Sequence, residues 1–164
     1  MSATSELLGN NADYVATFDK GDLALPPAKK VAVLARMDAR LDPAKALGLQ
    51  EGDAHVIRNA GGVASEDALR SLVISQRLLG TEEIVLVHHT DCGMETFRDD
   101  AVKDQILADT GLRPSFALEA FPDTDADVRQ TAARIRANPF IPKKEIRGFV
   151  YEVETGKLRE IGLD

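Results

Sequence analysis

The segment HTDC places His89 and Cys92 three residues apart, directly after an apolar run. On a turn that leaves a strand, this spacing lets an imidazole nitrogen and a thiolate face the same metal ion. The spacing alone is a weak signal, because a lone cysteine is more often a small buried apolar residue and one of two adjacent histidines often only satisfies a hydrogen bond. The neighbouring polar clusters must therefore decide between these interpretations.

A second polar cluster, ARMDAR, follows the apolar run KVAVLA and contains Arg36, Asp38 and Arg40. Asp38 and Arg40 are either a simple ion pair that anchors a loop or part of a site, and their place directly after a buried strand favours the site. Arg36 ends the apolar run, where a buried guanidinium needs anionic or hydrogen-bonding partners. Asp38, Asp91 and the Cys92 sulfur are the nearest such partners in the sequence.

A third polar cluster, RNAGG, spans residues 58–62. Gly61 and Gly62 most simply permit a tight turn, and contact of their backbone N–H groups with a ligand is a secondary interpretation. Asp91 is either solvated or a counter-ion to Arg36. His55 lies within a run that predicts a strand, and we interpret it as structural.

Three short apolar runs predict the strands that carry these clusters, at residues 30–35, 54–60 and 83–89. The first and third are almost continuously apolar, as in strands covered on both faces. Residues 65–80 predict a helix with Ser65 as N-cap and Gly80 as the stop. Two further helices are predicted at 99–109 and 124–137, and a hairpin that turns at Gly156 is predicted at 148–161.

This order of elements predicts an α/β fold, a three-layer α/β/α arrangement with a mainly parallel central sheet, a C-terminal hairpin strand and an N-terminal helical arm. Residues 1–164 are expected to form a single domain, because the chain is too short for two ordinary ones, with residues 1–29 as the arm and its linker. Ligands of such sheets bind beyond the carboxyl ends of the strands, where all three polar clusters fall.

Composition excludes several classes of partner. The chain has 20 basic and 27 acidic residues, a formal net charge of -7, and no basic block, which argues against nucleic acid. No segment approaches the roughly 20 apolar residues that cross a bilayer, which argues against a membrane protein. The single cysteine allows no intrachain disulfide and agrees with a reducing compartment. We therefore expect a soluble, cytoplasmic protein.

Four motifs, MDARLD, EGDAHVIRNAGG, RSLVISQRLLGT and HHTDCGM, resemble in order and spacing those of the β-class carbonic anhydrases, particularly the short bacterial type. In that family a CxDxR motif ends the first strand and an HxxC motif ends the third; two cysteines and the histidine hold zinc, beside an Asp–Arg dyad. The resemblance thus implies that His89 and Cys92 are zinc ligands and that Asp38 and Arg40 form the catalytic dyad. It also implies a homodimer or higher homo-oligomer that converts CO2 to bicarbonate reversibly.

The sequence departs from this pattern at one ligand, since Arg36 stands where the family motif begins with cysteine and Cys92 is the only cysteine. A guanidinium has no vacant orbital, so it cannot lower the pKa of bound water to about 7 as zinc does. At about 4 Å and an effective dielectric of about 20, a divalent ion facing it meets a repulsion of roughly 8 kcal/mol. Low or absent zinc occupancy is expected, unless Arg36 swings away or Asp38 turns in as a ligand.

Three functions follow from these alternatives. The first is a β-carbonic-anhydrase-like protein whose CO2 hydration is weakened or lost, a pseudoenzyme in the extreme case. The second is a non-catalytic bicarbonate-binding or oxyanion-binding regulator, in which Arg36 and Arg40 grip the anion in a pocket that includes Gly61, Gly62 and Asp91. The third is a hydrolase of carbonyl sulfide or carbon disulfide, which needs the metal as well.

Overall fold

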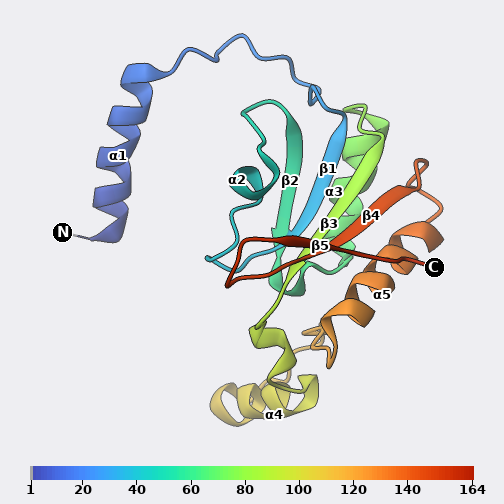
Figure 1. Ribbon diagram of the computed structural model, residues 1–164. Helices are drawn as coiled ribbons and strands as arrows, with labels where there is room; N and C mark the ends of the chain where they lie inside the picture. Colours follow the sequence, from blue (N-terminus) through green and yellow to red (C-terminus); the bar gives the residue numbers. More distant parts are fainter. Residues whose placement is uncertain (1) are drawn as a thin grey trace.

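A five-stranded sheet in the order β2-β1-β3-β4-β5 forms the centre of the computed structural model, which describes residues 2–164 (Figure 1). The strands are β1 Val31–Arg36, β2 Ala54–Asn59, β3 Glu83–His89, β4 Glu145–Tyr151 and β5 Leu158–Ile161. The pairs β1–β2, β1–β3 and β3–β4 are parallel, and β5 runs antiparallel to β4. The predicted α/β fold, with its mainly parallel sheet and C-terminal hairpin strand, is confirmed.

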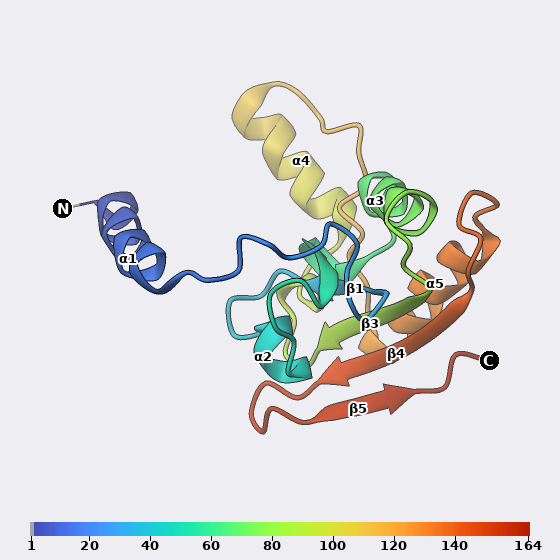
Figure 2. The same cartoon turned by 90° about the horizontal axis from the view of Figure 1, so that it is seen from above.

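The helices are α1 Ala3–Thr17, α2 Pro43–Leu47, α3 Glu66–Arg77, α4 Asp99–Thr110 and α5 Thr124–Ala137. Helices α3 and α5 supply most of the cover of one sheet face, whereas α2 and its flanking loops cover the other. The second helical layer of the predicted three-layer arrangement is therefore thin. Helix α4 lies beyond the carboxyl ends of the strands, and α1 stands apart on an extended linker (Figures 1 and 2).

Alternation along β1 explains why its sequence is almost continuously apolar. Ala32 and Leu34 pack in the cluster under α3 and α5, and Val33 and Ala35 pack in the cluster on the opposite face. All four are fully buried, so neither face of the strand tolerates a polar residue without a partner. The polar residue that ends this strand, Arg36, is buried as well.

Local signals placed most helix ends correctly. The Ser65 side chain accepts a hydrogen bond from the backbone N–H of Ala68, as expected of the N-cap of α3. The helix ends at Arg77, short of the predicted stop, and Gly80 with a φ of 75° instead turns the chain toward β3. Helix α2 was missed because it has only five residues, although Asp42 caps it and Pro43 begins it.

Helix α1 confirms the predicted N-terminal helical arm. It contains no buried residue, and its apolar side chains Leu7, Leu8 and Val15 are exposed. Tyr14 of α1 donates a hydrogen bond to the Glu51 carboxylate, and Lys20, just beyond the helix, forms a 2.8 Å ion pair with the same carboxylate. Among residues 2–164, no helix combines the length and the apolar character needed to span a bilayer.

Close packing between β4 and α5 gives a test of this architecture. A Cβ atom on Gly148 would lie 2.5 Å from Cγ1 of Val128, so we expect Gly148→Ala to lower the free energy of unfolding by about 1–3 kcal/mol. Gly162→Ala is the matched control, because nothing lies within 4 Å of its added Cβ. Urea unfolding of both variants measures the difference, and equal stability of the two would contradict this packing.

Candidate active site

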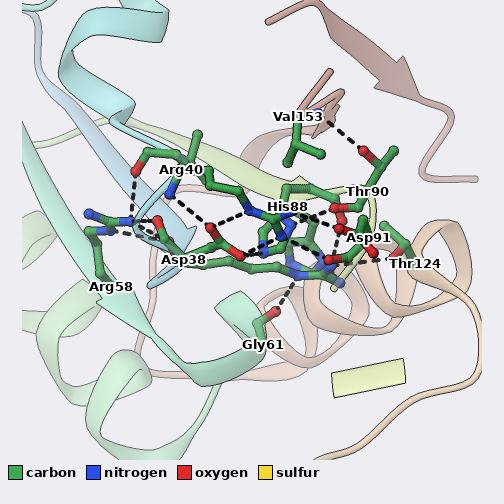
Figure 3. Close-up of polar contacts among 12 residues, drawn as sticks. Asp38, Arg40, Arg58, Gly61, His88, Thr90, Asp91, Thr124 and Val153 are labelled. Carbon is green, nitrogen blue, oxygen red and sulfur yellow. Dashed lines mark hydrogen bonds and ion pairs between the residues drawn. The ribbon is translucent and has the colours of Figure 1, made fainter. Parts of the chain in front are cut away.

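The carboxyl ends of β1, β2 and β3 bring the three polar clusters to one edge of the sheet, as predicted. Arg36 is in register with Asn59 of β2, and Ala35 with Val87 of β3. Figure 3 shows the polar side chains of this edge, with Asp38 and Arg40 close to Arg58. Short 3-10 turns at residues 60–62 and 93–95 follow β2 and β3 and line the same region.

The Arg36 guanidinium is buried, with 1% of the residue exposed, and each of its five N–H groups faces an acceptor of the protein. The acceptors are the carbonyl oxygens of Gly61 (3.0 Å) and His89 (2.8 Å), Oγ1 of Thr124 (3.3 Å), Nδ1 of His88 (3.0 Å) and Oδ2 of Asp127 (3.2 Å). Its guanidinium carbon also lies 4.3 Å from the centre of the Phe121 ring. No N–H of Arg36 is left to donate to an anion in this arrangement.

The carboxylate partner of Arg36 corrects one expectation from the sequence. The partner is the buried Asp127 in the first turn of α5, not Asp38 or Asp91. Burial lowers the pKa of Arg36, and the hydrogen-bonded carboxylate of Asp127 opposes that shift. Asp127 lies 91 residues from Arg36 in the sequence. An acidic residue in the first turn of a helix is already favoured by the helix dipole, so nothing in the sequence marked Asp127 as the partner of Arg36.

His88 and Gly62 complete the support of Arg36. Nε2 of His88 donates to the carbonyl oxygen of Gly62 at 3.1 Å, which leaves Nδ1 to accept from Arg36. Burial lowers the pKa of His88, consistent with a neutral ring. Gly62 has a φ of 65°, and a Cβ there would lie 3.0 Å from Cγ of Arg36 and 3.1 Å from Cδ2 of His88. Gly61 and Gly62 thus present carbonyl groups to this network, whereas the sequence had suggested backbone N–H groups.

Asp38 and Arg40 form the predicted pair. Nε of Arg40 donates to Oδ1 of Asp38 at 3.0 Å, and Nη2 donates to Oδ2 at 2.8 Å. These hydrogen bonds hold the pKa of Asp38 well below its usual range. Arg40 also binds Asp91 through the side chain at 2.7 Å and through the carbonyl oxygen at 2.9 Å. Asp91 is therefore a counter-ion of Arg40 and not of Arg36.

Arg58 positions the segment that carries this pair. Its guanidinium donates to the carbonyl oxygens of Arg36 (3.0 Å), Asp38 (2.8 Å) and Leu41 (2.7 Å). Sequence reasoning placed Arg58 in a polar cluster without a role. The sequence indicated only that Arg58 lies near the end of a strand. The parallel register of β1 and β2 is what places its guanidinium beside the carbonyl oxygens that follow β1.

A pocket of about 230 Å³ opens beside these groups and is lined by Arg36, Met37, Asp38, Ala60, Gly61, His89, Cys92, Gly93 and Met94. His89 donates from Nδ1 to the carbonyl oxygen of Thr90 at 2.7 Å, and its Nε2 faces Oδ2 of Asp38 at 3.5 Å. Burial, together with Arg36 and Arg40, lowers the pKa of His89. Asp91, predicted for this pocket, lines a different cavity with Arg40 and residues 152–155.

This sheet, with an Asp–Arg pair, a histidine and a cysteine at its carboxyl edge, defines a domain of the β-carbonic anhydrase type. A sequence model of the carbonic anhydrase family matches residues 31–113. β-Carbonic anhydrase 1 of Mycobacterium tuberculosis is 56% identical over 162 residues, which cover 98% of this chain and 99% of that protein. The chain belongs to the β-carbonic anhydrase family.

Two further similarities bear on the fold and the site. The crystal structure of a carbonic anhydrase from Streptococcus mutans superposes with a TM-score of 0.93 at 41% identity and covers 99% of both chains. A carbon disulfide hydrolase of Acidithiobacillus thiooxidans is 37% identical over 158 residues, 84% of this chain and 79% of that protein. Both confirm that the resemblance extends over most of the chain.

The described residues do not fit the zinc site that the family implies. Catalytic zinc takes three protein ligands and keeps one open position. Within residues 2–164, no three His, Cys, Asp or Glu side chains converge as a metal site. Asp38 is committed to Arg40 through both carboxylate oxygens, and the cationic Arg36 lines the pocket that holds His89 and Cys92. Two ligands remain, next to a positive charge.

The buried pair of Arg36 and Asp127 gives the test of this geometry. Asp127→Asn leaves the guanidinium without its carboxylate, so we expect the free energy of unfolding to fall by about 3 kcal/mol. Combining it with Arg36→Met should recover part of that loss, a coupling of about 1–3 kcal/mol. Asp125→Asn, which breaks the more exposed pair with Arg159, is the control and should cost below about 1 kcal/mol. Purely additive effects at positions 36 and 127 in urea unfolding would refute the pairing.

Proposed function

We propose that this β-carbonic anhydrase family member has weakened or lost the zinc-dependent hydration of CO2. One observation carries the proposal: the position that the family motif gives to a cysteine holds Arg36, which is buried, cationic and fully hydrogen-bonded inside the protein. Swinging Arg36 outward would break five hydrogen bonds and leave Asp127 buried without its partner. An outward rotation of Arg36, which would relieve its repulsion of a metal ion, is therefore strongly unfavourable.

The chemistry of the remaining residues supports the same conclusion. Zinc, where the family binds it, supplies hydroxide at neutral pH by lowering the pKa of bound water. No described side chain replaces that function, because guanidinium groups cannot accept an oxygen lone pair. Asp38 and Arg40, which the family resemblance implies as the dyad, pair with each other and would still orient a polar substrate, but orientation alone does not generate the nucleophile.

The other two functions have less support. An oxyanion grip would need free guanidinium donors, yet Arg36 has none and Arg40 directs four of its five N–H groups to Asp38 and Asp91. Hydrolysis of carbon disulfide is the activity named for several relatives, but that reading also requires the metal. A cytoplasmic location stays a prediction from the composition of the sequence.

Metal content and hydration rate together test the proposal. We expect the purified protein to carry well under one zinc per chain and to hydrate CO2 far more slowly than a zinc β-class enzyme in stopped-flow assays. Arg36→Cys should raise zinc content and activity together, because it restores the third ligand and removes the positive charge. Arg36→Met removes the charge without adding a ligand and should gain neither. One zinc per chain with a normal hydration rate in the unaltered protein would overturn the proposal.

We also propose that the chain assembles as a homodimer. The apolar side chains of α1 lie exposed on an arm that has no core of its own, and Leu107 of α4 and Phe116 beyond it are exposed as well. The outer edge of β2 pairs with no other strand within residues 2–164, and an open edge of six residues readily pairs with another chain. A second copy would cover both features.

Light scattering tests the dimer. The unaltered chain should have at least twice the 17.8 kDa mass of one copy. Replacing Leu7 and Leu8 by glutamate should shift the protein toward monomer, because the arm then loses its apolar surface. Glutamate at Asn10 and Asn11 adds the same charge to the same helix and should leave the dimer intact. A concentration-independent monomer for the unaltered chain would end this proposal.

A further inference from the structure

A groove of about 260 Å³ lies between α3 and β2, the outer strand of the sheet (Figure 1). His55 and Ile57 of β2 are in register with Ala32 and Leu34 of β1, so their side chains point to the sheet face that α3 covers. The opposite wall of the groove comes from α3 and the turn after it. None of the residues that line this groove also lines the pocket beside Arg36.

The His55 ring is held by two buried hydroxyl groups. Its Nδ1 lies 2.7 Å from Oγ of Ser75, and that oxygen lies 2.7 Å from Oγ1 of Thr81. Within residues 2–164 these hydroxyl groups form no other side-chain hydrogen bond, and both residues are buried. Each hydroxyl proton finds an acceptor only if Thr81 donates to Ser75 and Ser75 donates to Nδ1 of His55. Nε2 therefore carries the proton of the neutral ring.

Three hydrogen-bond donors of the groove are free for a ligand. Nε2 of His55 and the hydroxyl of Ser71 have no partner among the described residues, 2–164, and neither is enclosed in the protein. Arg70 has one weak contact, a 3.3 Å hydrogen bond from Nη1 to Asp67, and 69% of its side chain is exposed. No carboxylate of the described residues lines the groove, so a guanidinium and two neutral donors favour an anion there.

The remaining lining of the groove is apolar and is formed by Ile57, Ile74 and Leu79. Ile74 is 37% exposed. An inorganic anion would leave these side chains in water, whereas a ligand with an apolar body would cover them and gain the free energy of burial. The volume lies below the roughly 300–1,000 Å³ of sites for drug-sized ligands, which favours a small molecule.

We propose that this groove binds a small organic carboxylate. Arg70, Ser71 and Nε2 of His55 donate to the carboxylate, and the apolar body of the ligand packs against Ile74 and Leu79. The inference does not rest on the proposed loss of CO2 hydration, because the groove shares no residue with that site. It requires that a second copy paired along β2 leaves the groove open, so the test uses the protein in its own assembly state.

Titration of ¹⁵N-labelled protein with sodium benzoate, followed by NMR, tests the groove. We expect saturable shifts of the amide signals of residues 55, 71 and 74, and none with benzamide, which has a similar shape but no charge. Arg70→Gln should weaken binding by about tenfold or more, the usual effect of losing a charged hydrogen bond. His55→Asn keeps an acceptor for Ser75, removes the donor and should also weaken binding. Arg77→Gln, on the same helix but outside the groove, is the control and should bind as the unaltered chain does.

Three results would overturn the inference: no saturable shift with benzoate, equal binding of benzamide, or binding that Arg70→Gln leaves unchanged. Because Arg70 is exposed, its replacement tests the site even if His55→Asn disturbs the fold. Dispersed amide signals show that each variant is folded, and light scattering of the same samples gives their assembly state. The proposed function is decided separately, by zinc content and hydration rate.

Discussion

The ion pair between Arg36 and Asp127 is the interaction on which the rest of this edge of the sheet depends. It joins the end of β1 to the first turn of α5, and through the carbonyl groups of Gly61 and His89 it also fixes the turns after β2 and β3. Four separate segments thus meet at a single guanidinium. At the position that the family motif gives to a cysteine, this chain thus places a cation that holds these segments together.

The fold followed from the sequence because its signals are local. The apolar runs of β1 and β3, the N-cap Ser65 and the turn at Gly156 each depend on a few neighbouring residues, and the structure has all of them in place. The pairing of Asp38 with Arg40 was also predictable, since the two residues are adjacent on one turn. Helix α2 was not predictable, because five residues are too few to show a helical repeat of apolar positions.

The sequence predicted which types of group surround Arg36 but not which residues they are. A buried guanidinium needs anionic or hydrogen-bonding partners. The sequence predicted Asp38, Asp91 or the Cys92 sulfur as the nearest partners and gave no reason to choose Asp127. The choice is made by how α5 crosses the sheet, which is a long-range property. Arg58 shows the same limit, because its contacts with the carbonyl groups of residues 36, 38 and 41 arise from strand pairing and not from spacing along the chain.

The tight fit of Gly62 against both Arg36 and His88 limits what each of these positions tolerates. Once the arginine is seated, any side chain at position 62 collides with it, and a smaller residue at position 36 strands a carboxylate and a histidine in the interior. Positions 36, 62, 88 and 127 are therefore energetically coupled, and a change at one of them is tolerated only with matching changes at the others. Arg36 is thus held in place by its neighbours, so that replacing it alone disturbs both the turn after β2 and the first turn of α5.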